Sequence, residues 1–120
     1  MRKIFFSALA LAAAPALFGQ QTARDFAAVT QRTYRVVPNI TYPIANNWEA
    51  KLDVYTPRDA QGPVPTMIYI HGGGWVGGSK ESVVLQLLPY MELGMAVVNV
   101  EYRLGPVSLA PAAVIECCCA

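Results

Sequence analysis

Two short apolar runs dominate the hydrophobic pattern of the chain. Residues 66–70 (Thr-Met-Ile-Tyr-Ile) and residues 96–100 (Ala-Val-Val-Asn-Val) are nearly continuous apolar segments, a pattern typical of strands that are buried on both faces. A strand, a helix and a second strand of this combined length favour a right-handed parallel crossover. The pattern therefore predicts an α/β fold that contains a parallel β-α-β unit.

The segment between these runs is predicted to form a helix that ends at Leu93. Ser79 or Ser82 can cap its first turn. Pro89 should kink or restart the helix, and Gly94 suits the left-handed conformation that ends many helices. Apolar side chains recur at helical spacing and are expected to face inward: Val84, Leu87, Leu88 and Met91.

An antiparallel hairpin is predicted before the first apolar run. Residues 34–42 are rich in β-branched and aromatic side chains, although Pro38 interrupts them, and residues 49–55 alternate between apolar and polar positions. Asn46-Asn47 between the two segments is a turn signal. The expected order is therefore a hairpin that leads into the parallel unit.

The N-terminal residues 1–19 are typical of a signal peptide. Arg2 and Lys3 precede the apolar segment 4–18, which is shorter than the roughly 20 residues that a membrane span needs. Small residues follow, and cleavage is expected between Ala16 and Gln21. The sequence therefore predicts a secreted or periplasmic protein with no membrane span in its mature form.

Removal of the signal leaves a leader, residues 20–33, and one small domain, residues 34–120. The mature chain carries seven basic residues, because Arg2 and Lys3 are lost from the total of nine, against eight acidic ones. This balance gives no electrostatic basis for binding nucleic acid or an anionic membrane.

The three cysteines, Cys117, Cys118 and Cys119, are adjacent at the end of the chain. They have no upstream cysteine as a disulfide partner, and a bond between neighbours is strained. Three consecutive thiolates cannot easily surround one metal ion, so no metal site is expected. Their simplest interpretation is a helix that begins near Pro111.

A glycine turn directly follows the first apolar run, in the sequence His71-Gly72-Gly73-Gly74-Trp75. Glycines at the carboxyl end of a parallel strand present bare backbone N–H groups, which a substrate oxygen can approach closely. Such fixed donors stabilise a developing oxyanion by several kcal/mol. The turn therefore indicates an oxyanion hole more strongly than a turn of purely geometric purpose.

This segment resembles the oxyanion loop of α/β-hydrolase esterases and lipases of the hormone-sensitive-lipase-like and feruloyl-esterase-like groups. Three flanking segments agree with the resemblance: residues 52–57 (Leu-Asp-Val-Tyr-Thr-Pro), 77–80 (Gly-Gly-Ser-Lys) and 101–104 (Glu-Tyr-Arg-Leu). The resemblance covers roughly residues 34–120. It implies a partial α/β-hydrolase fold, a small-molecule ester as substrate, and no cofactor.

The resemblance also implies roles for individual residues. The N–H groups of Gly73 and Gly74 would be the oxyanion donors, while His71, with Gly72, would support the loop and would not be the catalytic histidine. Trp75 would either line the acyl pocket or pack beneath the loop. Tyr102 and Arg103 follow the second strand and would together brace the loop. Alternatively, Arg103 is a solvated charge at the end of the strand.

No serine of the mature chain lies in a G-x-S-x-G turn, and the one histidine, His71, is already placed. The serine nucleophile, the acid and the catalytic base of a serine hydrolase are therefore not expected in this chain; the resemblance places them further along. The 120-residue chain is read as a truncated N-terminal portion. Alone, it is expected to be inactive and poorly soluble, because the strand at 66–70 would lack a neighbour.

Two other classes of function fit part of the pattern. Gly72-x-Gly74-x-x-Gly77 matches a dinucleotide fingerprint, and Glu101 lies at about the required distance beyond it. However, the capping serines place the helix after the glycines, and a hairpin precedes the strand, where such folds begin with the strand itself. A non-catalytic secreted binding module remains the second alternative.

Overall fold

The computed structural model describes residue 28 and residues 30–120. The predicted signal peptide, residues 1–19, lies outside the described residues. The chain divides into a first unit, residues 1–33, and a second, compact unit, residues 34–120. All strands and helices discussed below belong to the second unit.

The predicted hairpin is confirmed, and both of its strands extend closer to the turn than predicted. Strand β1 (Tyr34–Ala45) pairs antiparallel with strand β2 (Trp48–Pro57). Asn46 and Asn47 join them with φ angles of 52° and 60°. Asparagine tolerates this left-handed conformation better than most residues, and two such residues form the tight turn that suits twisted strands.

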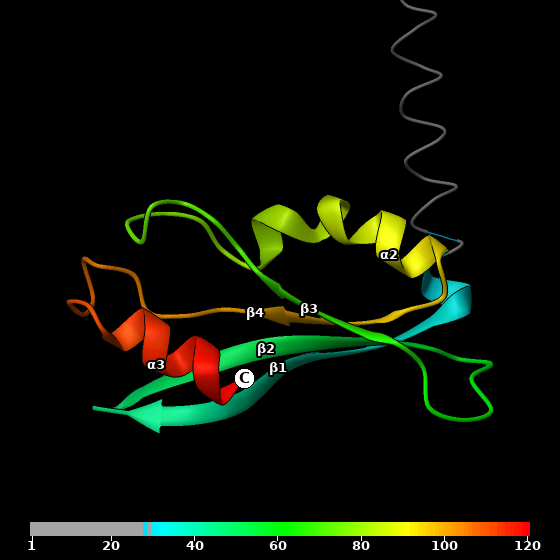
Figure 1. Ribbon diagram of the computed structural model, residues 1–120, viewed down its shortest axis with the longest axis horizontal. Helices are drawn as coiled ribbons and strands as arrows, with labels where there is room; N and C mark the ends of the chain where they lie inside the picture. The colour runs from blue at the N-terminus through cyan, green and yellow to red at the C-terminus, as the bar shows by residue number, and fades with distance from the viewer. Residues whose placement is uncertain (1–27, 29) are drawn as a thin grey trace, which may run out of the picture. The chain divides into compact units, whose positions relative to one another are not determined.

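The four strands form one mixed sheet in the order β1-β2-β4-β3. Strands β3 (Thr66–Ile70) and β4 (Ala96–Val100) are parallel, whereas β2 and β4 are antiparallel. Figure 1 shows the hairpin beside the parallel pair, with a helical crossover above them. The predicted α/β fold is thus confirmed.

The expected burial of the first apolar run is wrong. Strand β3 lies at an edge of the sheet among the described residues, and Ile68 and Ile70 are 52% and 47% exposed. Met67 and Tyr69, which point to the opposite face, pack against the core. The buried central strand is instead β4, which pairs with a strand along each of its edges. Its residues Val97 and Val100 are fully buried.

The crossover is helical but begins differently from the expectation. A 3₁₀-helix η1 (Glu81–Leu87) is followed by helix α2 (Leu88–Glu92), so the helix restarts beside Pro89, as expected. The helix ends before Gly94, whose φ angle is 76°. The predicted serine cap is not the N-cap, which is Lys80. Ser79 and Ser82 instead bond to each other.

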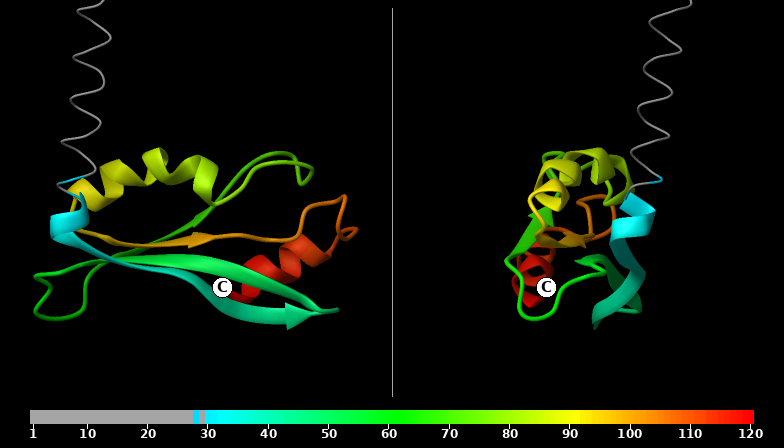
Figure 2. Two further views of the ribbon diagram at one scale, coloured as in Figure 1. Left: turned by 180° about the vertical axis from the view of Figure 1, so that it is seen from behind. Right: turned by 90° about the vertical axis from the view of Figure 1, so that its right-hand side faces the viewer.

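Two layers of helix enclose the sheet. Figure 2 shows η1 and α2 on one face and α3 (Ala112–Cys119) on the other. Val83 is buried on η1, whereas Val84 and Leu88, which were expected to face inward, are half-buried. The main apolar cluster lies beneath the crossover: Tyr34, Tyr55, Leu87, Met91 and Val97.

Candidate active site

The glycine turn lies at the carboxyl end of β3, directly after His71. Its backbone is unusual, since Gly73, Gly74 and Gly78 have φ angles of 131°, 61° and 99°, and Trp75 has one of 62°. Only glycine adopts such angles without steric cost. The glycines are therefore required to turn the chain sharply away from the strand.

Gly73 is the tightest point of the turn. Its carbonyl oxygen accepts hydrogen bonds from the N–H groups of Val76 and Gly77, both at 3.2 Å. A Cβ atom on Gly73 would lie 1.9 Å from the carbonyl oxygen of Gly77, whereas one on Gly72 would meet nothing within 4 Å. The two neighbouring glycines therefore differ, and only Gly73 is fixed by packing as well as by φ.

The backbone N–H groups of Gly73 and Gly74 are unpaired in the described part of the chain, as neither donates a hydrogen bond to a protein atom there. Both residues are exposed and border a cavity of about 460 Å³. Free donors at the rim of a cavity can bind an incoming oxygen without first breaking an internal bond.

The opposite wall of this cavity comes from α3, through Ala113, Val114, Cys117 and Cys118. The lining is almost entirely apolar, which suits a small organic ligand held by few polar groups. The cysteines are free thiols on a helix, as expected. Burial raises the pKa of the Cys117 thiol, and the neighbouring Cys118 adds to this effect, so the reactive thiolate form is disfavoured.

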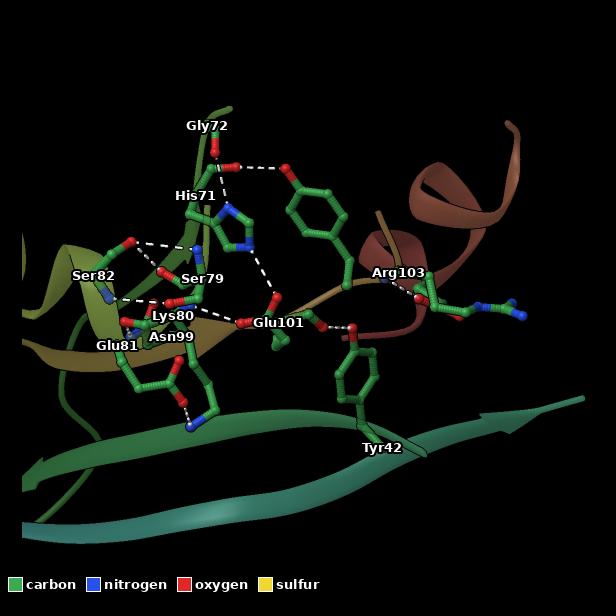
Figure 3. Close-up of polar contacts among 12 residues, drawn as sticks. Tyr42, His71, Gly72, Ser79, Lys80, Glu81, Ser82, Asn99, Glu101 and Arg103 are labelled. Carbon is green, nitrogen blue, oxygen red and sulfur yellow. Dashed lines mark hydrogen bonds and ion pairs between the residues drawn. The ribbon is translucent and has the colours of Figure 1, made fainter. Parts of the chain in front are cut away.

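His71 directly precedes the glycine turn and is buried, with only 2% of its surface exposed. Its ring stacks on Tyr102 with centroids 4.4 Å apart, and the Tyr102 hydroxyl donates to the His71 carbonyl oxygen at 2.8 Å. Nδ1 lies 2.9 Å from the Gly72 carbonyl oxygen, and Nε2 lies 3.2 Å from Glu101 Oε1 (Figure 3). The neutral ring donates one of these two bonds, from whichever nitrogen carries its proton, whereas the imidazolium form donates both.

The structure distinguishes the alternatives for Trp75 and Arg103. Trp75 is 64% exposed and borders the cavity, so it does not pack beneath the loop. Arg103 is buried, so it is not a solvated charge. It does not bond to the glycine turn either: its Nε and its backbone N–H both donate to the Glu116 carboxylate, which ties the end of β4 to α3. Of these two residues, only Tyr102 bonds directly to the loop.

A buried ion pair lies near the glycine loop and was not predicted from the sequence. Lys80 Nζ lies 2.9 Å and 3.0 Å from the two carboxylate oxygens of Asp53, and both residues are under 10% exposed. Asn99, on β4, donates to the Lys80 carbonyl oxygen at 2.7 Å. In the sequence, Asp53 and Lys80 stand out only as members of two separate flanking motifs. Their contact could not be predicted, because it depends on which strands become neighbours.

The geometry disfavours the dinucleotide alternative. A phosphate group bound by that fingerprint would lie at the start of a helix that opens within the glycines, yet η1 begins only at Glu81. Both carboxylate oxygens of Glu101 also face internal donors, His71 Nε2 and the Lys80 N–H. In the described part of the chain, no cluster of His, Cys, Asp and Glu side chains could hold a metal, and no helix is long and apolar enough to cross a membrane.

Comparison with known proteins gives consistent relatives. Kynurenine formamidase of Salmo salar is 37% identical over 67 residues, which cover 56% of this chain and 23% of that protein. Versiconal hemiacetal acetate esterase of Aspergillus parasiticus is 43% identical over 63 residues, 52% of this chain and 20% of that protein. The chain thus spans about a fifth to a quarter of the length of these curated relatives.

Solved esterase structures match over more of the chain. A bacterial heroin esterase superimposes with a TM-score of 0.61 and 32% identity, covering 90% of this chain and 34% of that protein. A hyperthermophilic esterase from the archaeon Pyrobaculum calidifontis gives 0.59 and 40%, covering 69% of this chain and 26% of that one. The BD-FAE family model matches residues 52–120, more than half of the chain. The chain therefore belongs to the BD-FAE family and has the fold of the N-terminal part of an α/β-hydrolase esterase.

Proposed function

We propose that this chain supplies the oxyanion-stabilising part of a carboxylic-ester hydrolase of the serine type. The observation that carries the proposal is the pair of unpaired N–H groups on Gly73 and Gly74 at the rim of an apolar cavity. An ester carbonyl oxygen that becomes negatively charged during acyl transfer needs such donors. The apolar cavity suits the carbon skeleton of a small ester.

The nucleophile, the acid and the catalytic base are proposed to come from outside these 120 residues. His71, the only histidine of the sequence, is enclosed by Tyr102, Glu101 and its own loop and is 2% exposed, so it is poorly placed to exchange protons with a substrate. The chain alone is therefore expected to show no esterase turnover. The N-terminal segment 1–19 further supports export to the periplasm or the medium.

The test is a chimera with a relative. Residues 34–120 replace the corresponding segment of the bacterial heroin esterase, which superimposes with 90% of this chain, and hydrolysis of p-nitrophenyl acetate is measured. The chimera is expected to turn over the ester, whereas the same host without the segment is not. A folded chimera without activity would contradict the proposal.

Two glycine variants of the chimera localise the effect. Gly73→Ala brings a Cβ against the Gly77 carbonyl oxygen at 1.9 Å and displaces the donors, so kcat should fall about 100-fold or more with little change in KM. Gly62→Ala is the matched control, since a Cβ there meets nothing within 4 Å in a distant loop. Equal loss in both variants would sink the assignment.

A further inference from the structure

Both ends of the loop that carries the glycine turn contact the same side chain. His71, directly after β3, and Lys80, directly before η1, are the two ends of this loop. Both reach Glu101, which directly follows β4: His71 Nε2 lies 3.2 Å from Oε1, and the Lys80 N–H donates to Oε2 at 2.7 Å. Figure 3 shows this carboxylate between the two ends of the loop.

We propose that Glu101 is a positioning residue of the glycine turn, in which each carboxylate oxygen holds one end of the loop and so fixes the N–H groups of Gly73 and Gly74. The inference rests on the proposed function for its catalytic meaning, but the clamp itself is a property of the loop and can be measured without any activity.

Glu101 is itself mounted on the sheet. Its N–H donates to the carbonyl oxygen of Lys51 on β2 at 2.9 Å. Its carbonyl oxygen accepts a hydrogen bond from the hydroxyl of Tyr42 on β1 at 2.6 Å. The backbone that carries the carboxylate is therefore tied to both strands of the hairpin, and movement of the loop relative to the sheet must break contacts with the carboxylate.

The carboxylate of Glu101 provides the clamp with two charged acceptor oxygens. An ionised carboxylate offers an acceptor oxygen to each end of the loop, whereas a glutamine of nearly the same shape offers one oxygen and one NH₂ donor. The amide of Glu101→Gln can still accept from the Lys80 N–H, but toward His71 it presents an NH₂ group, so the bond to a charged carboxylate is replaced by a weaker neutral one to the tautomer that carries its proton on Nδ1. The wild-type bonds to a charged acceptor are the stronger kind.

The experiment follows amide hydrogen exchange in the full chain, comparing wild type, Glu101→Gln and the control Glu92→Gln. Glu92 is an exposed carboxylate at the end of α2. In Glu101→Gln, the Val76, Gly77 and Lys80 amides should exchange roughly five- to tenfold faster relative to those of β1 and β2, because a charged hydrogen bond is replaced by a neutral one. In Glu92→Gln, this ratio should stay within about twofold.

The ratio of loop exchange to sheet exchange separates a clamp from general stability. If Glu101→Gln speeds up loop and sheet equally, or neither, the proposal is overturned. If Glu101→Gln does not fold, Glu101→Asp is measured instead: it keeps both acceptors on a shorter side chain that cannot reach both ends, so the ratio must again rise, and an unchanged ratio overturns the proposal.

The single histidine provides a spectroscopic signature. Because His71 is the only histidine, its ring nitrogens give one set of ¹⁵N resonances that needs no assignment. The Nε2 resonance should shift in Glu101→Gln and stay unchanged in Glu92→Gln; an identical spectrum in all three proteins would contradict the contact. Inactivity of the chimera would instead refute the proposed function and leave these measurements intact.

Discussion

At the scale of single residues, the buried pair of Asp53 and Lys80 determines how the end of the glycine loop meets the sheet. Asp53 Oδ1 also accepts the N–H of Asn39, which has a φ of 57° at an irregularity of β1. Lys80 additionally contacts Glu81 at 2.8 Å. A buried charge is tolerated only when it is paired in this way, and removal of one partner leaves the other unpaired.

Lys80→Met should therefore lower the free energy of unfolding by about 3–5 kcal/mol, because it leaves the Asp53 carboxylate buried and unpaired. Lys51→Met is the matched control: Lys51 pairs with Glu49 on the exposed hairpin surface, and its loss should cost at most about 1 kcal/mol. Urea unfolding of the three proteins measures both values. Equal effects of the two substitutions would contradict the account.

The same pair predicts a dependence on alkaline pH. Burial lowers the pKa of Lys80, but its bonds to Glu81 and Asp53 outweigh this effect and raise the pKa above the ordinary value of 10.5. A raised lysine pKa gives stability that is complete below about pH 10.5 and is lost as the pH rises through the folded-state value. The stability difference between wild type and Lys80→Met should accordingly shrink above pH 10.5.

The pattern of residues predicted local features well and long-range pairs poorly. Gly94 and Pro89 lie where their backbone preferences placed them, because those preferences depend on the residue itself. The contacts between Asp53 and Lys80, or between His71 and Glu101, depend on the order of the strands. A lone charge in a strand pattern is usually solvent-facing, so the burial of Asp53 could not be predicted.

At the scale of elements, strand β3 combines an apolar sequence with an edge position. Its outer face carries Ile68 and Ile70, about half exposed, and the described residues provide no strand along its free edge. The apolar run was predicted as a strand because of its composition, but composition alone does not determine which edge is paired. Exposed apolar edges promote association between chains.

The chain expressed alone should consequently self-associate, and Ile68→Lys should increase its monomeric fraction, because a charge on an edge strand opposes pairing with another edge. Sedimentation velocity measures the distribution of species. Leu85→Lys, at a position that is 76% exposed on η1, serves as the comparison with the same charge change. If both substitutions have the same effect, the edge of β3 is not the cause.

At the scale of the whole molecule, the chain combines a proposed export signal and a proposed oxyanion-binding turn with part of an esterase fold. The described domain matches about a third of the heroin esterase structure, so most of that relative lies outside the matched region. The glycine turn could be predicted from sequence because its sharp geometry depends on the glycines themselves. The cavity opposite it could not, since α3 is brought there by the fold.

Export predicts a shortened mature chain. Expression of the full sequence in a bacterial host with a periplasm should yield a protein whose N-terminus lies between Ala16 and Gln21, because signal peptidases cleave after small residues. Mass spectrometry of the intact protein from the periplasmic fraction reads the position. Replacing Arg2 and Lys3 with glutamate should keep the chain unprocessed; an uncleaved wild-type chain in the cytoplasm would contradict the export proposal.

The central claim is that the N–H groups of Gly73 and Gly74 bind the oxyanion, and a crystal structure of the chimera inhibited by a phosphonate ester tests it most directly. The phosphonyl oxygen mimics the charged oxygen of the transition state. It should lie about 2.7–3.1 Å from both amide nitrogens. A phosphonyl oxygen that points to solvent, or that bonds to donors outside the glycine turn, would contradict the account.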